Sequence, residues 1–145
     1  MTRSLAVLLA AGLAVLPALA VEFRTVATAT VLYDAPSPRG KKLFVIKRDT
    51  PVELVVLLEG WAKVRDSEGG MAWLESKYLA MRHSVVVTAP RAQIRQSADE
   101  SADLVFEAER NVALDYLEAA ASGWVKVRHR DGASGYVRAD QIWGL

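Results

Sequence analysis

The sequence contains no cysteine and only two histidines, His83 and His129, among its 145 residues. Without cysteine the chain can form no disulfide and has no thiol nucleophile. Neither histidine has a second histidine or a carboxylate at the spacing of a metal site, and no set of acid, base and nucleophile converges elsewhere. We therefore expect a protein that is not an enzyme, with no metal site and no cofactor.

An excess of either charge is also missing. The chain has 18 lysines and arginines against 17 aspartates and glutamates, a formal net charge of +1. A nearly neutral chain lacks the broad positive surface that binding to nucleic acid or to anionic lipid requires. Outside the first twenty residues no long segment has helical periodicity. We therefore expect an all-β fold and a partner that is not nucleic acid.

Residues 1–20 differ in composition from the remaining chain. Arg3 precedes the apolar run Leu5–Leu16, Pro17 interrupts the run, and Ala18-Leu19-Ala20 places small residues where signal peptidase reads them. The run is shorter than the roughly 20 residues of a membrane-spanning helix. A retained anchor is the alternative, but the pattern favours a secretory signal peptide cleaved after Ala20. We then expect a periplasmic or secreted protein that is not attached to a membrane after cleavage.

The remaining chain is a duplication. The hexapeptide Gly60-Trp61-Ala62-Lys63-Val64-Arg65 returns 63 positions later as Gly123-Trp124-Val125-Lys126-Val127-Arg128, and each copy lies among short β-branched segments separated by turn signals. This pattern predicts two tandem small β-barrels, in residues 21–81 and 82–145. The segment at the boundary, residues 80–83, has no glycine or proline and is too short for a flexible tether. We expect the barrels to touch.

The segment Val52–Glu59 is apolar on both faces of the strand it predicts. Its even positions are all apolar, and the odd positions include Val55 and Leu57, where a strand with one solvated face is polar. Burial against the other repeat explains this pattern, and so does a bent strand that faces two small cores in turn. Both interpretations predict that Val55 and Leu57 are buried.

Alternation along the repeated hexapeptide separates a core face from an outer face. Ala62 and Val64 point one way while Trp61 and Lys63 point the other, and the second copy divides in the same manner. A hairpin that turns about Glu68 places Lys63 opposite Trp73, and the equivalent turn places Lys126 opposite Tyr136. Each repeat is therefore expected to present outward aromatics flanked by cations, a surface suited to stacking. Equally, such aromatics can cover the barrel or fill the contact between repeats.

Several segments resemble Src homology 3 domains. Val31-Leu32-Tyr33-Asp34-Ala35 is similar to the A-L-Y-D-Y stretch of that family, Gly60-Trp61 to its conserved tryptophan, and Trp73–Leu79 to its closing segment. The G-W-x-K-V-R form and the signal peptide make the chain more similar to the bacterial, exported branch. The resemblance implies two SH3-like barrels. Bacterial members often accompany cell-wall hydrolases and bind peptide stems or cross-bridges of peptidoglycan, or other envelope proteins.

In the first repeat the family's ligand-contacting aromatics correspond to Tyr33, Trp61 and Tyr78. The second tyrosine of the family motif is Ala35 here, and Glu75 stands where a proline is expected, so a polyproline groove does not follow. The second repeat departs further, with Arg95 and Gln141 at the positions of Tyr33 and Tyr78.

The leading hypothesis is a non-catalytic binding module that recognises a peptide in peptidoglycan or on an envelope protein. Its predicted ligand-binding residues are Tyr33, Trp61, Trp73 and Tyr78, with Trp124 and Tyr136 as a second site. The alternative is a structural or regulatory scaffold module, whose aromatics pack between the two repeats and which docks to a larger envelope partner. The sequence leaves the oligomeric state open. The cations at Lys41, Lys42, Lys47 and Arg48 are interpreted as a solvated sheet edge that resists pairing.

Overall fold

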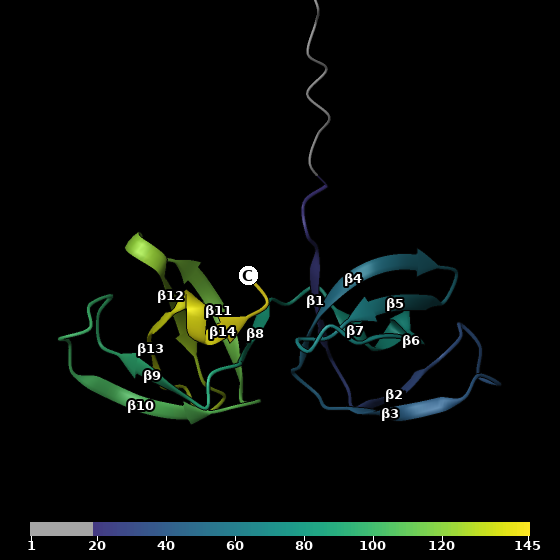
Figure 1. The fold of residues 1–145 in the computed structure, drawn as a ribbon, viewed down its shortest axis with the longest axis horizontal. Coiled ribbons are helices and arrows are strands. Elements are labelled where there is room, and N and C mark those ends of the chain that lie inside the picture. Colours follow the sequence, from purple (N-terminus) through teal and green to yellow (C-terminus); the bar gives the residue numbers. More distant parts are fainter. Residues whose placement is uncertain (1–18) are drawn as a thin grey trace, which may run out of the picture.

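The computed structural model describes residues 19–145, which form two β-sheets side by side (Figure 1). The predicted signal peptide falls almost entirely on residues 1–18, outside the described part, so its cleavage stays a prediction. The described residues contain fourteen strands, three short 3₁₀ helices and no α-helix. The prediction of an all-β fold with two tandem barrels is confirmed.

The first repeat forms a seven-stranded antiparallel sheet. Its strands follow one another around the barrel in the order β3-β2-β6-β5-β4-β1-β7. The elements are β1 Phe23–Val26, β2 Thr30–Tyr33, β3 Lys42–Ile46, β4 Pro51–Leu58, β5 Trp61–Arg65, β6 Met71–Glu75, the 3₁₀ helix η1 Ser76–Tyr78, and β7 Leu79–Ala80.

The second repeat builds the same sheet from equivalent strands, in the order β10-β9-β13-β12-β11-β8-β14. A short 3₁₀ helix again precedes the last strand, and a further one lengthens the turn before β12. The elements are β8 Ser84–Val87, β9 Arg91–Arg95, β10 Leu104–Glu109, β11 Ala113–Ala119, η2 Ala121–Gly123, β12 Trp124–Arg128, β13 Ser134–Arg138, η3 Ala139–Gln141 and β14 Ile142–Trp143.

The repeated hexapeptide supplies the centre of each barrel core. Ala62 and Val64 of β5 are buried with Leu74 of β6, and Val125 and Val127 of β12 are buried in the second core. The opposite faces of both strands pair as predicted, because Lys63 lies across from Trp73 and Lys126 lies across from Tyr136. The alternation in the sequence therefore located both faces of this hairpin correctly.

The backbone conformation explains why each hexapeptide begins with glycine. Gly60 and Gly123 adopt φ of +77° and +79°, the left-handed region that a side chain disfavours. Both lie in the connection that leads into the central strand, β5 in the first repeat and β12 in the second. The glycine thus allows the chain to reverse immediately before the tryptophan.

The predicted burial of Val55 and Leu57 is wrong. Strand β4 is buried at Pro51 and Val52, but residues 55–58 are all exposed, and Leu57 is 58% exposed. The pairing of β4 with β1 stops at Glu53, and the register with β5 shifts between Leu54 and Val56. The end of β4 therefore projects beyond the barrel as a two-stranded hairpin that neither repeat covers.

The two repeats are in direct contact around the linker Met81–His83, which joins β7 to β8. The Thr25 hydroxyl of β1 lies 2.8 Å from the Ser84 hydroxyl of β8, and both residues are buried. The His83 ring stacks on Phe23 of the first repeat and on Tyr116 of the second, with centroid distances of 6.3 and 4.2 Å. The short linker is thus packed from both sides.

The fold predicts a contrast between two leucines of the first repeat. Leu74→Ala removes a side chain with 0% exposure from the core and should lower the free energy of unfolding by about 2–5 kcal/mol. Leu57→Ala, at the exposed end of β4, should change it by less than about 0.5 kcal/mol. Urea unfolding followed by tryptophan fluorescence measures both. A cost for Leu57→Ala close to that of Leu74→Ala would contradict the projecting hairpin.

Candidate ligand-binding site

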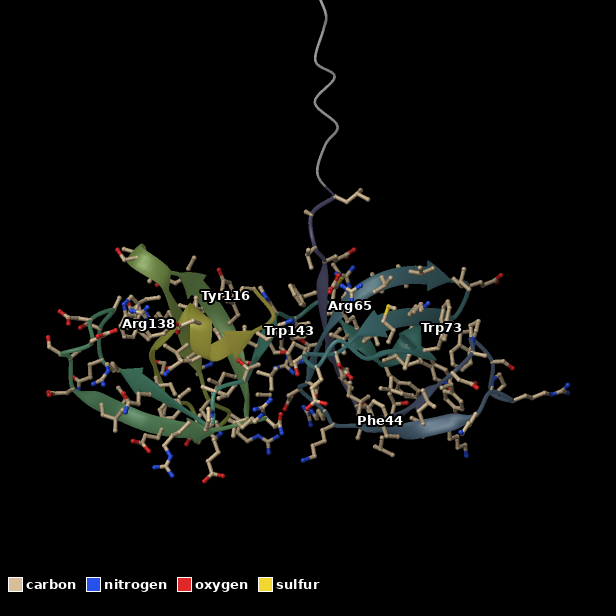
Figure 2. The ribbon with its side chains drawn as sticks, viewed as in Figure 1. Phe44, Arg65, Trp73, Tyr116, Arg138 and Trp143 are labelled. Carbon is tan, nitrogen blue, oxygen red and sulfur yellow. The ribbon has the colours of Figure 1, made fainter. Side chains whose placement is uncertain are left out.

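Three predicted aromatics of the first repeat come together on one surface. The rings of Tyr33 on β2 and Trp61 on β5 meet edge to face, with centroids 5.5 Å apart and an interplanar angle of 86°. Trp73 on β6 (Figure 2) lies directly across from Tyr33 in the sheet. All three side chains are half-buried, so each ring has one part packed and another part open to a ligand. We call Tyr33, Trp61 and Trp73 the aromatic surface.

Tyr78 and two lysines border this surface. The amide of Ser76, at the start of η1, donates to the carbonyl of Gly60 at 3.0 Å, which places the 3₁₀ helix that carries Tyr78 beside the base of Trp61. The Lys77 ammonium lies 5.0 Å from the Tyr78 ring centroid, and the Lys63 ammonium lies 5.9 Å from the Trp73 ring. Cations at these distances are attracted to the ring faces.

The loop between β2 and β3 makes the border of the aromatic surface basic. The Asp34 carboxylate accepts a hydrogen bond of 2.8 Å from the Lys41 amide, so the one acidic side chain of the loop is committed to holding its shape. Arg39, Lys41 and Lys42 remain exposed. A ligand that reaches this loop from the aromatic surface is therefore expected to carry negative charge there.

The tryptophan of the second repeat is buried, unlike Trp61 of the first. Trp124 is only 5% exposed, because the Arg138 guanidinium lies over its ring at 5.7 Å. Glu75, which cannot stack in this way, occupies the position of Arg138 in the first repeat. Trp124 is thus not the exposed aromatic that the sequence predicted. Tyr136 is half-buried, with the Lys126 ammonium 5.8 Å from its ring.

A polar pocket of about 420 Å³ lies over Trp124. It occupies the place that the aromatic surface has in the first repeat, since Arg95 and Gln141 stand at the positions of Tyr33 and Tyr78. The Arg138 guanidinium pairs with Glu100 at 3.0 Å, and Arg95 donates to the Ala102 carbonyl at 2.8 Å. The pocket is lined by Gln93, Arg95, Glu100, Trp124, Arg138, Asp140 and Gln141.

Sequence reasoning did not identify this pocket. The sequence does contain a signal for the pocket, because arginine and glutamine stand at the positions of the two tyrosines. This substitution was interpreted only as the loss of an aromatic groove. The hairpin register that places Lys126 opposite Tyr136 also places Arg138 opposite Trp124, but it does not show that the guanidinium lies over the ring and covers it.

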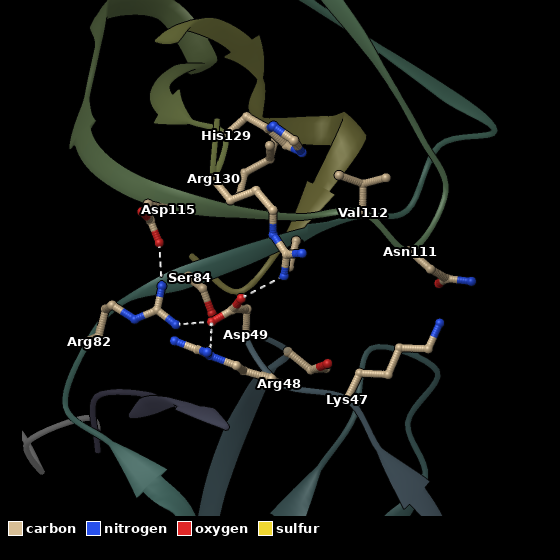
Figure 3. Close-up of a pocket in the computed structure, with 13 residues that line it drawn as sticks. Lys47, Arg48, Asp49, Arg82, Ser84, Asn111, Val112, Asp115, His129 and Arg130 are labelled. Carbon is tan, nitrogen blue, oxygen red and sulfur yellow. Dashed lines mark hydrogen bonds and ion pairs between the residues drawn. The ribbon is translucent and has the colours of Figure 1, made fainter. Parts of the chain in front are cut away.

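A second cleft, of about 420 Å³, lies between the repeats (Figure 3). The Arg82 guanidinium, from the linker, donates to Asp115 of the second repeat at 2.5 Å and also to Asp49 of the first. Arg130 of the second repeat donates to the other oxygen of Asp49 at 3.3 Å. The cleft is therefore crossed by a network of alternating charges that links both repeats through the linker.

These contacts change the pKa of Asp49. Burial alone raises the pKa of a carboxyl group, but hydrogen bonds from Arg82 and Arg130 outweigh it and lower the pKa of Asp49 below its ordinary value of 3.8. The side chain sits on a backbone with φ of +69°, and Asn111 has the same φ at the equivalent turn of the second repeat. Asp and Asn tolerate this left-handed conformation better than most residues.

None of the six predicted aromatics lines the cleft between the repeats. The ring contacts near the linker involve Phe23, His83, Tyr116 and Trp143 instead, with Phe23 and Trp143 edge to face at 5.0 Å. Sequence reasoning missed these residues and the charges of the cleft, because no spacing in the chain relates them.

Two further properties concern residues 19–145. Within them, no group of three or more histidine, aspartate or glutamate side chains could hold a metal ion. No helix in this part of the chain has the length and apolar composition needed to cross a membrane.

Two antiparallel barrels, each with a 3₁₀ helix before its last strand, define a tandem SH3-like architecture. The family model described as bacterial SH3 domain matches the chain twice, at residues 26–80 and 88–144. The chain belongs to the bacterial SH3 domain family, whose members are typically non-catalytic binding modules associated with the cell wall. No curated protein matches its sequence significantly.

Solved structures that are similar to the chain come from a protozoan and a bacterium. NlpC2 and NlpC1 from Trichomonas vaginalis match 86% and 89% of this chain with 48% of their own, each at 16% identity and a TM-score of 0.39. An NlpC/P60 family protein from Bacillus cereus ATCC 10987 matches 84% with 56% of its own chain, at the same identity and TM-score. This chain thus spans about half the length of these structures, and such a loose overlay carries no functional conclusion.

The charge network in the cleft predicts a pH-dependent stability. Because the pKa of Asp49 is lowered in the folded state, its contribution is complete above the unfolded value near 3.8 and is lost as pH falls through the folded pKa. Asp49→Asn preserves the shape and the backbone preference but removes the charge. We expect it to lower the free energy of unfolding at pH 7 by roughly 1 kcal/mol. We also expect the free energy of unfolding to decrease less than that of the wild type as pH falls below about 4.

Urea unfolding at pH 7 and at several values between about pH 2 and 4 measures this difference. Asp103→Asn is the matched control, since Asp103 is exposed and outside the cleft. Equal pH dependence of the two variants would show that Asp49 does not stabilise the contact between repeats through its charge.

Proposed function

We propose that the chain is an exported, non-catalytic binding protein that recognises a peptide of peptidoglycan or of an envelope protein through its first repeat. The observation that supports the proposal most directly is the packing of Tyr33 against Trp61 at 86° beside Trp73, with every ring half-buried. Rings held by one another lose little conformational freedom when a ligand stacks on them. Export rests on the predicted signal peptide in residues 1–20.

The charge around the aromatic surface supports a ligand with carboxylates. Lys63 and Lys77 lie on its border, and Arg39 and Lys41 extend from the neighbouring loop. Glu75 is the acidic residue on this border, and it pairs with Lys77 at 3.0 Å. A peptide with free carboxyl groups and apolar side chains therefore suits this surface better than the cationic, proline-rich ligands of eukaryotic relatives.

The scaffold hypothesis, in which the aromatics pack between the repeats, finds less support. Neither Trp61 nor Trp73 lines the cleft, and other rings occupy the contact near the linker. The second repeat, where Arg138 covers Trp124, is assigned a supporting role in this proposal.

Binding to purified peptidoglycan sacculi tests the proposal. Trp61→Ala removes the ring that Tyr33 packs on, so we expect a loss of about 2 kcal/mol of binding free energy, roughly thirtyfold in Kd. Met71→Ala, an exposed apolar residue on the same strand as Trp73, is the matched control and should bind as the wild type does.

Equal retention of the wild type and Trp61→Ala would exclude the aromatic surface as the binding site. No retention of either protein would exclude the cell-wall version. Cross-linking in the periplasm from position 61 then tests whether the ligand is an envelope protein. The absence of any cross-linked adduct would exclude that ligand as well.

A further inference from the structure

Two of the longer strands have one edge that no other described strand covers. β3 ends the first sheet and pairs only with β2, and β10 ends the second sheet and pairs only with β9. The strands at the opposite ends of the sheets, β7 and β14, have only two residues each. β3 and β10 are therefore the long free edges, with backbone groups available for another strand.

Both free edges carry exposed apolar side chains. Phe44 and Val45 on β3 are 51% and 64% exposed, and Leu104 and Val105 at the start of β10 are exposed as well. An exposed apolar edge is a template for pairing unless its charges prevent it. The charges that flank the two strands therefore decide which partner each strand accepts.

These flanking charges have opposite sign. Segment 41–48, around β3, contains the cations Lys41, Lys42, Lys47 and Arg48 and no acidic residue. The equivalent segment 103–110, around β10, contains the anions Asp103, Glu107 and Glu109 and one cation, Arg110.

Most of these charges are free for an external partner. Among residues 19–145, no ion pair involves the three lysines of segment 41–48, and none involves Asp103 or Glu109. Glu107 pairs only with Arg91 on the adjacent strand, at 3.3 Å. In the turn beside β3, the Asp66 carboxylate accepts hydrogen bonds from the amides of Glu68 and Gly70, and the exposed Glu68 is the acidic side chain of this turn that no described ion pair involves.

A groove borders each edge, so that a second chain can approach it. Beside β3 the groove has about 300 Å³ and lies between residues 44–47 on one side and the turn at residues 66–68 on the other, with Val86 and Asn111 of the second repeat also in its lining. Beside β10 it has about 420 Å³ and lies between residues 106–109 and His129 of the equivalent turn. Duplication has thus produced the same open edge twice, with opposite charges.

We propose that β3 of one copy of this chain pairs edge to edge with β10 of a second copy. The cations of β3 repel another β3, and the anions of β10 repel another β10, because like charges on facing strands destabilise pairing. Only the unlike combination brings opposite charges together, and it also covers the exposed Phe44 and Val45. The cations of segment 41–48, interpreted from the sequence as a barrier to pairing, thus select an acidic edge instead.

The contact leaves one edge of each copy free. In Figure 1, β3 and β10 lie along the same side of the molecule, one in each barrel. The remaining pair of edges either closes a two-fold dimer or extends the assembly. The contact involves none of the three residues of the aromatic surface, so it goes beyond the proposed function and can fail independently of it.

Sedimentation velocity of the chain from Val21 onward, which contains every strand, tests the proposal. We expect association that grows with protein concentration at low salt and weakens in about 0.5 M salt, because the charges are exposed. Lys42→Glu with Lys47→Glu should weaken association at least about tenfold, and so should Glu107→Lys with Glu109→Lys. An equimolar mixture of these two variants should associate again, since the unchanged acidic β10 of the first variant then meets the unchanged basic β3 of the second.

Glu59→Lys with Glu118→Lys is the matched control for the β10 variant, because it makes the same change in net charge as Glu107→Lys with Glu109→Lys at exposed positions outside both edges. It should associate as the wild type does. A wild type that stays monomeric up to about 1 mM at low salt would overturn the proposal. So would association that either edge variant leaves unchanged, or a mixture that stays monomeric.

A second measurement does not depend on charge reversal. Since the chain has no cysteine, a chain with Val45→Cys and one with Glu107→Cys can be joined only through these positions by a short bismaleimide. We expect this pair to cross-link at least tenfold faster than Val45→Cys with Glu118→Cys. Equal rates would overturn the edge contact.

Discussion

Arg82 fixes how the two repeats sit against each other. It belongs to the three-residue linker, its guanidinium binds a carboxylate of each repeat, and its carbonyl accepts a hydrogen bond of 2.5 Å from the Thr25 hydroxyl. Ion pairs as exposed as these contribute little stability individually, typically below about 1 kcal/mol. The packing of Phe23 against His83 and Trp143 adds apolar contact between the repeats, while the charges constrain their orientation.

Duplication preserved the scaffold and changed the surfaces. The left-handed Gly60 recurs as Gly123 and the core Val64 as Val127, while the buried Ala62 and Leu74 are replaced by other apolar residues, Val125 and Val137. At the aromatic surface and its border, by contrast, Tyr33 is replaced by Arg95 and Glu75 by Arg138. These two substitutions convert an aromatic surface into a charged pocket with a covered tryptophan, without altering the strands beneath.

The sequence predicted what depends on local periodicity. Alternation and the constant shift of 63 positions located the core, the strand faces and the cross-strand partners of Lys63 and Lys126. They could not predict features that depend on where a strand ends relative to its neighbours. Leu57 is exposed because β1 stops pairing at Glu53. The burial of Trp124 was missed for another reason, since the register pairs it with Arg138 but does not show that the guanidinium covers the ring.

The linker has a consequence for ligands with more than one attachment point. Because Met81–His83 is packed and tied to both barrels, the aromatic surface of the first repeat and the pocket over Trp124 in the second keep a fixed separation. A flexible tether spreads the effective concentration of a second binding group over a wide range of distances. Here that concentration would be confined to one span, so a ligand with two binding groups would gain avidity from both surfaces only if the distance between its groups matched that span.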